Sequence, residues 1–310
     1  MTSQTLATNR NAKAGGVLLT MVGLAFLLVG GPAASGQKVS TAAEKSRYAT
    51  LDGARIHYQS YGKGREALVL IHGWTCNLNY WRDQVPDFAK RNRVIALDLP
   101  GHGRSDKPEL AYTMDLFARA VDAVMRDAKV ERAVLVGHSM GTPIARQFYR
   151  KYPEKTLAIV IVDGGLRPFG DKKMRDGFVE AFRAPNYKEA GMKMFGAMAG
   201  PQLPAETQEF IKTSFLNTPQ RVLVSAMEGM NDESLYGPDK MNVPVLAILA
   251  KSPFWAADTE QFFRSISPNL EFHMWEGVGH FLMMERPKQF NEAVVVFLNK
   301  NSLLNKTLKQ

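Results

Sequence analysis

The feature that most constrains the fold is a series of short, continuously apolar runs separated by segments with helical periodicity. The runs cover residues 67–71, 93–97, 133–136, 157–162 and 245–250. A strand buried on both faces, as in a parallel sheet, has this composition. Helical patterns between the runs, notably at 114–128 and 144–152, indicate βαβ units. We therefore expect an α/β fold with a mostly parallel sheet, helices on both faces and functional loops at the strands' carboxyl ends.

Both ends of this pattern carry further elements. Two alternating runs around Asp52-Gly53 predict a hairpin before the first buried run. After the last buried run we expect a helix near 259–266, a strand at 271–275 and a closing amphipathic helix at 287–298. The predicted core therefore has two parts, residues 46–163 and 243–300, and is followed by a polar tail, 301–310.

The alternation stops between residues 164 and 242. Helical patterns around 178–182, 190–198, 206–215 and 221–230 are separated by prolines, with no convincing strand among them. We predict an all-helical insertion that leaves the sheet after Val162, returns near Val243 and acts as a lid over the strand ends.

Residues 1–36 differ in composition from the rest of the chain. Arg10 and Lys13 precede an uncharged apolar stretch, 15–31, which is followed by small residues up to Gly36. This order is typical of a secretory signal peptide, and retention of the segment as an N-terminal anchor is the alternative. Residues 37–45 form a polar linker. We expect export to the periplasm or the extracellular space, with membrane contact only through this N-terminal segment.

The charge and the cysteine count exclude several classes of function. The formal net charge is +9, but Lys and Arg are scattered, and no basic run is interleaved with aromatic residues. A nucleic-acid partner is therefore not expected. The chain has one cysteine, Cys76, so it has no intrachain disulfide. No zinc-ligand spacing and no Gly-x-Gly-x-x-Gly loop is present, and we expect no metal and no cofactor.

The residues Gly137-His138-Ser139-Met140-Gly141 follow the buried run 133–136 and precede a helical pattern. They match a Gly-x-Ser-x-Gly nucleophile elbow, in which a tight strand-to-helix turn exposes the serine hydroxyl at the edge of the sheet. An acyl-transfer serine also needs two backbone N–H groups aimed at the oxyanion. Met140, directly after the serine, and Trp74, in the loop after the 67–71 run, are the candidate donors.

The general base must be a histidine on a late loop. The chain has histidines at 57, 72, 102, 138, 273 and 280. His280 stands in a glycine-containing loop immediately after the predicted 271–275 strand, and it gives the chain order Ser, acid, His. We therefore assign the base to His280.

These motifs together resemble the α/β-hydrolase family, in particular its lidded esterase, haloperoxidase-like and proline-iminopeptidase-like branch. The residues that carry the resemblance are the runs 72–74, 98–106, 137–141 and 277–281, in the family's order and spacing. The resemblance covers about residues 46–300 and implies an eight-stranded sheet. It also implies that the 98–106 loop is structural.

The acid of the triad departs from the family pattern. The position where the family usually has its aspartate, just after the 245–250 strand, holds Pro253 or Phe254. Two replacements remain open. Asp163 ends the 157–162 strand, from which some branches supply the acid; Asp258 lies later in the expected loop, where it also looks like a helix N-cap. A Ser-His dyad or another partner is the third alternative.

The predicted function is that of an exported serine hydrolase that cleaves a small to medium hydrophobic ester through an acyl-enzyme. Trp74, Phe254 and Trp255 flank the predicted mouth and are candidate substrate-binding residues, although they could equally pack the lid onto the core. An aminopeptidase-like amidase is the nearest enzymatic alternative. A non-catalytic ligand-binding protein on the same scaffold is the alternative from another class. The oligomeric state is not predicted.

Overall fold

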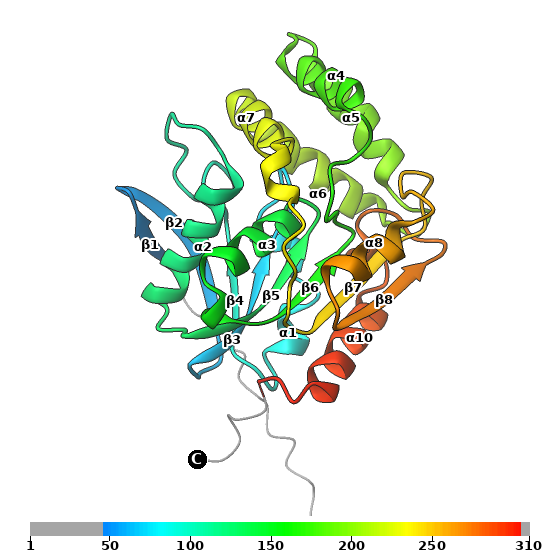
Figure 1. Ribbon diagram of the computed structural model, residues 1–310. Helices are drawn as coiled ribbons and strands as arrows, with labels where there is room; N and C mark the ends of the chain where they lie inside the picture. Colours follow the sequence, from blue (N-terminus) through cyan, green and yellow to red (C-terminus); the bar gives the residue numbers. More distant parts are fainter. Residues whose placement is uncertain (1–45, 305–310) are drawn as a thin grey trace, which may run out of the picture. The chain divides into compact units, whose positions relative to one another are not determined.

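Eight strands form one sheet in the described part of the chain, in the order β1-β2-β4-β3-β5-β6-β7-β8 (Figure 1). The computed structural model describes residues 46–304, so the predicted signal segment and linker and the end of the tail lie outside the described residues. The strands are β1 (Arg47–Leu51), β2 (Ala54–Tyr61), β3 (Glu66–Ile71), β4 (Val94–Leu97), β5 (Arg132–His138), β6 (Thr156–Val162), β7 (Val245–Ala250) and β8 (Leu270–Trp275). Only β2 among them runs against the others, which confirms the mostly parallel sheet.

The predicted hairpin and the central strands form for the expected reasons. Leu51 pairs with Ala54, so Asp52 and Gly53 make a two-residue loop, and both have positive φ angles, of 50° and 84°. This is the conformation that matches the twist of a hairpin. β4 and β7 are buried along their whole length, and β3, β5 and β6 are buried apart from single residues at or near their starts. The continuous apolar runs are therefore the core of the sheet.

Helices join these strands. They are α1 (Val85–Phe88), α2 (Met114–Asp127), α3 (Gly141–Lys151), α8 (Thr259–Ile266), α9 (Leu282–Glu285) and α10 (Pro287–Lys300), with single 3₁₀ turns at η1 (Leu78–Trp81) and η2 (Pro153–Lys155). α2 packs on α3, and α1 packs on α10. Given this strand order, right-handed crossovers place α2, α3 and α8 on one face of the sheet and α1 with α10 on the other.

A helical insertion separates β6 from β7. It contains α4 (Lys172–Arg183), α5 (Tyr187–Met198), α6 (Ala205–Leu216), α7 (Gln220–Met230) and the turn η3 (Glu233–Tyr236). Each helical pattern seen in this stretch of the sequence is a helix. Figure 1 shows these helices gathered beyond one end of the sheet. Within residues 46–304, no helix is long and apolar enough to cross a membrane.

Candidate active site

Ser139 occupies a strained turn between β5 and α3. Its φ angle is 53°, a left-handed conformation that costs a residue other than glycine about 1–3 kcal/mol. The glycines on either side allow the turn to close: a Cβ on Gly137 would lie 2.3 Å from the Gly141 carbonyl oxygen, and one on Gly141 would lie 2.4 Å from the Ile71 oxygen. The Ser139 N–H donates to the Val162 oxygen at 2.9 Å. The surrounding backbone therefore fixes the serine at the carboxyl end of β5.

His280 and Asp163 meet beside this turn. His280 Nδ1 lies 2.6 Å from Asp163 Oδ2, and both side chains are largely buried, 15% and 8% exposed. The other carboxylate oxygen, Oδ1, accepts the Ala250 N–H at 2.8 Å. Because a carboxylate only accepts, the Nδ1 of His280 carries a proton, and the Nε2 of the neutral ring keeps a free lone pair.

Asp258 has a different partner. Arg167 Nη1 donates to its Oδ2 at 3.0 Å and Nη2 donates to its Oδ1, and the Asp258 side chain is 55% exposed. The hydrogen bond from Arg167 holds the pKa of Asp258 below its usual value. Asp258 stands at the N-cap of α8, as its sequence context indicated, but its side chain makes no capping hydrogen bond. The structure thus brings Asp163, and not Asp258, to His280.

His138 links the serine turn to His280, a contact that the sequence does not reveal. Its Nε2 lies 2.9 Å from the His280 carbonyl oxygen and must donate to it, and the two rings are 4.7 Å apart. Burial, together with the neighbouring His280, holds the pKa of His138 well below 6.5. His138 is therefore a neutral hydrogen-bond donor. The spacing of the elbow locates this residue, but no sequence signal identifies its partner.

Two backbone N–H groups beside Ser139 are available to hold an oxyanion. Within residues 46–304, neither the Met140 nor the Trp74 N–H donates a hydrogen bond inside the protein. Met140 directly precedes α3, whose N-terminus carries a partial positive charge. The loop after β3 reaches the same place, since a Cβ on Gly73 would lie 3.1 Å from Ser139 Cβ. The two predicted oxyanion donors therefore come from segments that converge on the serine.

Trp74 reaches from the core into the helical insertion. Its Nε1 donates to the Leu223 oxygen of α7 at 2.9 Å. Its ring packs on three phenylalanines of the insertion, with ring centroids at 4.8 to 6.3 Å: Phe182, Phe195 and Phe215. The side chain is 7% exposed. Trp74 thus packs the insertion onto the core, which was one of the two roles left open for it.

The other two aromatic residues singled out from the sequence lie after β7. Phe254 is 56% exposed and packs against Phe169, with ring centroids 5.4 Å apart. Trp255 is half-buried, and its ring would lie 3.9 Å from a Cβ on Gly165. Trp255 therefore lies against the segment that follows Asp163, whereas Phe254 is on the outer surface.

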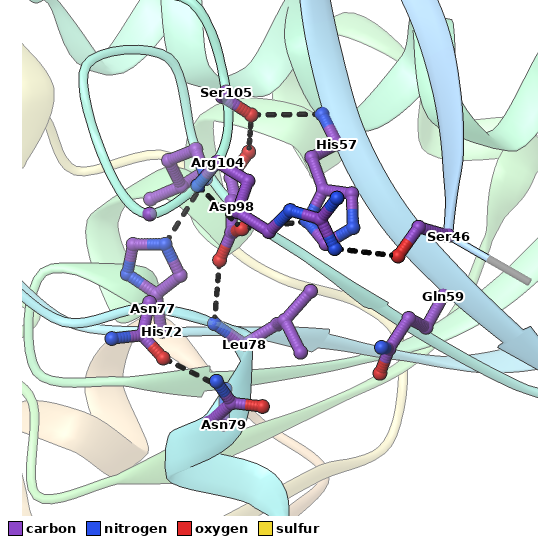
Figure 2. A network of polar contacts seen from close by, with 12 residues as sticks. Ser46, His57, Gln59, His72, Asn77, Leu78, Asn79, Asp98, Arg104 and Ser105 are labelled. Carbon is purple, nitrogen blue, oxygen red and sulfur yellow. Dashed lines mark hydrogen bonds and ion pairs between the residues drawn. The ribbon is translucent and has the colours of Figure 1, made fainter. Parts of the chain in front are cut away.

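The loop after β4 forms a buried polar network centred on Asp98 (Figure 2). Asp98 accepts from His57 Nδ1 at 2.7 Å and from the N–H groups of Leu78 and Arg104 at 2.8 and 2.9 Å. Burial opposes its charge, but these hydrogen bonds hold the pKa of Asp98 below its usual value. The Ser105 hydroxyl bridges the network by accepting from the His57 N–H and donating to the Asp98 carbonyl.

His72 connects this network to the loop beside Ser139. Its Nε2 accepts the Leu99 N–H at 3.0 Å, so its Nδ1 carries the proton and donates to the Gly73 oxygen at 2.8 Å. Burial lowers the pKa of His72 and keeps the ring neutral. The 98–106 loop therefore supports the backbone of the Gly73-Trp74 segment, in line with a structural role. Within residues 46–304, no group of three or more His, Cys, Asp or Glu side chains could hold a metal ion.

Comparisons with known proteins agree with this architecture. The family model described as "alpha/beta hydrolase fold" matches residues 66–287. A 2-hydroxy-6-oxononadienedioate/2-hydroxy-6-oxononatrienedioate hydrolase of Paraburkholderia phymatum is 29% identical over 286 residues, covering 84% of this chain and 98% of that protein. The solved structure of Est816, described as an N-acyl homoserine lactone degrading enzyme, is 29% identical, with a TM-score of 0.72 over 81% of this chain and 100% of that one. The esterase EaEST from Exiguobacterium antarcticum, 21% identical with a TM-score of 0.74 over 82% of this chain and 100% of its own, shares the fold.

Proposed function

The chain belongs to the alpha/beta hydrolase fold family and is a hydrolase enzyme, and from that premise we propose that it is a serine hydrolase with Ser139 as nucleophile, His280 as general base and Asp163 as the acid. The observation that carries the proposal is the 2.6 Å contact between His280 Nδ1 and Asp163 Oδ2 beside a serine on a strained elbow. A histidine held by a carboxylate in this way presents an unprotonated Nε2 that can accept a proton.

The reaction has two steps. The Ser139 hydroxyl attacks the substrate's acyl carbonyl carbon while its proton passes to His280 Nε2, and the alcohol then leaves with that proton. Water attacks the resulting acyl-enzyme in the same way, so that the acid is released and Ser139 regains its proton. Asp163 stays ionised in both steps and stabilises the positive charge on the ring of His280.

The oxyanion is held by the backbone N–H groups of Met140 and Trp74 in this proposal. Neither group has a partner within residues 46–304, and the start of α3 adds a favourable dipole. Removing one donor of such a pair in other enzymes costs about a hundred- to a thousandfold in kcat. Because both donors belong to the backbone, side-chain substitutions reach them only by moving the turn.

The substrate that we propose is a small to medium hydrophobic ester, cyclic esters included. Three phenylalanines of the insertion pack on Trp74 of the oxyanion loop and form an uncharged aromatic cluster with it: Phe182, Phe195 and Phe215. An apolar acyl group suits such surroundings better than a sugar or a phosphate does. The resemblance to Est816, a lactone-degrading enzyme, favours including lactones among the candidates.

A panel of substrates tests this proposal. We expect purified protein to hydrolyse p-nitrophenyl esters of short to medium acyl chains, and Ser139→Ala to reduce kcat by at least about a thousandfold. The same panel includes an N-acyl homoserine lactone, which tests the cyclic esters, and an aminoacyl p-nitroanilide, whose hydrolysis would indicate an amidase. Turnover of the anilide alone would replace the esterase by the amidase. A folded protein without turnover on any of the three would favour a ligand-binding protein.

We also propose that the protein is exported. The basic residues, the apolar stretch and the small residues of segment 1–36 support this proposal. Expression with a C-terminal tag, followed by cell fractionation and N-terminal sequencing, tests it. We expect a mature N-terminus near residue 36 in the periplasm or medium, whereas full-length chain in the cytoplasm would contradict export.

A further inference from the structure

A buried carboxylate, Glu285, lies between the helical insertion and the loop that carries His280. Two segments need names here: the connector, residues 199–204 between α5 and α6, and the histidine loop, residues 276–281 between β8 and α9. Glu285 stands on α9, is 9% exposed, and accepts the N–H of Gly279 with Oε1 at 2.9 Å. It therefore holds the backbone of the histidine loop next to the proposed base.

The second oxygen of this carboxylate faces the connector. A Cβ on Gly200 would lie 2.0 Å from Glu285 Oε2, so the carboxylate lies directly against the connector backbone. Within residues 46–304, Oε2 makes no hydrogen bond of ordinary geometry, but the N–H groups of Gly200 and Gln202 favour its charged form. Burial outweighs them and raises the pKa of Glu285. One carboxylate thus accepts a hydrogen bond from the histidine loop and lies against the backbone of the connector.

The two backbones also touch directly. The His280 N–H donates to the Met198 oxygen at the end of α5 at 2.9 Å, and Gln202 Nε2 donates to the Gly277 oxygen at 3.0 Å. A Cβ on Gly279 would lie 2.3 Å from the Gly200 nitrogen. The connector and the histidine loop therefore pack backbone against backbone, with no room for a side chain between Gly200 and Gly279.

We propose that Glu285 is a positioning residue: its carboxylate fastens the connector of the helical insertion to the histidine loop and so fixes the backbone that carries His280. Glu285 touches no reacting atom in this proposal and acts through the backbone at Gly279 and His280. The expected effect of Glu285 on catalysis rests on the proposed function. The fastening itself is a property of the backbone and can be measured without a substrate.

The Glu285→Gln variant distinguishes the roles of the two carboxylate oxygens. Its amide oxygen can still accept the Gly279 N–H, but a neutral NH₂ group then replaces the carboxylate oxygen that lies against the connector backbone at Gly200. We expect kcat/KM for the best p-nitrophenyl ester to fall about ten- to a hundredfold, mainly in kcat, because a displaced base reacts poorly even when the substrate is bound. Gly200→Ala, which moves the connector and leaves Glu285 intact, should give the same pattern.

A structural control and a double variant make the test decisive. Asn291→Ala removes part-buried hydrogen bonds from α10 to Asp83 and Asp87, neither of which belongs to the connector or the histidine loop, and should lower Tm while keeping kcat. If Glu285→Gln and Asn291→Ala lower Tm equally and both keep kcat, Glu285 has only a structural role and the proposal fails. The combination of Glu285→Gln and Gly200→Ala should lose less activity than the product of the two single losses, since both break one contact. Independent, multiplying losses would contradict the proposal.

Hydrogen exchange tests the fastening without any turnover. We expect the amides of residues 199–203 and 277–280 to exchange at least about tenfold faster in Glu285→Gln than in the wild type, with no change in β5. Exchange that is unchanged in both segments would overturn the proposal. Wild-type protein that hydrolyses no ester would instead overturn the proposed function, and the exchange result would still decide whether Glu285 joins the two segments.

Discussion

Replacing Asp163 by asparagine tests the assignment of the acid, because the structure dictates how the amide must sit. In the wild type, Oδ1 accepts the Ala250 N–H and Oδ2 faces His280 Nδ1. In Asp163→Asn, the amide oxygen stays with the Ala250 N–H and the NH₂ group turns towards His280. Nδ1 of His280 must then accept, which puts the ring proton on Nε2. A ring in that tautomer cannot take the serine proton.

The size of the effect follows from the two ways in which the variant can respond. Turning the amide over would restore the contact to His280 but leave the buried Ala250 N–H facing an NH₂ group, which costs about 1–3 kcal/mol. The turned amide would also carry no charge to stabilise the ring cation. We therefore expect kcat to fall about a thousand- to ten-thousandfold, which corresponds to about 4–5.5 kcal/mol of activation free energy.

The assay compares Asp163→Asn with a matched control, Asp258→Asn. Asp258 is the other aspartate that the sequence left open, and it bonds to Arg167 on the surface. Initial rates with the best p-nitrophenyl ester, corrected for folded protein by circular dichroism, should show the large loss for Asp163→Asn and less than about a threefold change for Asp258→Asn. The reverse order of losses, or wild-type kcat in Asp163→Asn, would refute the reasoning.

Three further predictions concern stability. Gly141→Ala places a Cβ 2.4 Å from a backbone oxygen of β3 and should lower the free energy of unfolding in urea by at least about 1–3 kcal/mol. Gly177→Ala, with no atom within 4 Å of its new Cβ, is the control and should not destabilise the protein. Equal urea midpoints for the two variants would contradict the elbow geometry. Trp74→Phe removes the indole N–H that donates to the Leu223 oxygen of α7, and should lower the free energy of unfolding by about 0.5–1.5 kcal/mol and speed amide exchange in α7. Burial lowers the pKa of three histidines below 6.5, so below that pH the unfolded chain binds protons that the folded chain does not. The free energy of unfolding should therefore decrease as the pH is lowered, by up to about 1.4 kcal/mol per pH unit for each histidine. Urea titrations from pH 7 to pH 5 that show constant stability would refute this. These histidines are His72, His102 and His138.

The sequence predicts the fold well where one local cause decides the structure. Strands buried on both faces need apolar residues at every position, so β3, β5, β6 and β7 stand out from the sequence. The hairpin turn needs residues that tolerate positive φ, and Asp52-Gly53 supplies them. The helices of the insertion follow from prolines that separate periodic segments, although the sequence does not show how they pack.

The site is predictable only in part, because its partners lie far apart in the chain. Ser139 and His280 follow from motif and position, but the choice between Asp163 and Asp258 depends on which carboxylate reaches a ring across the sheet. The turn at the end of β6, where Asp163 has a φ of 45°, aims the carboxylate, and no sequence pattern specifies that angle. The contacts of His138 and Glu285 could not be predicted either, since each joins a side chain to a backbone group that only the folded chain brings near.

Mass spectrometry of the protein after reaction with a fluorophosphonate tests the central claim, a serine nucleophile activated by histidine, most directly. We expect a single adduct on the wild-type chain, located on the peptide that contains Ser139, and no adduct on Ser139→Ala. His280→Ala should react at least about a hundredfold more slowly. A folded wild-type protein that stays unlabelled, or an adduct on any other residue, would contradict the account.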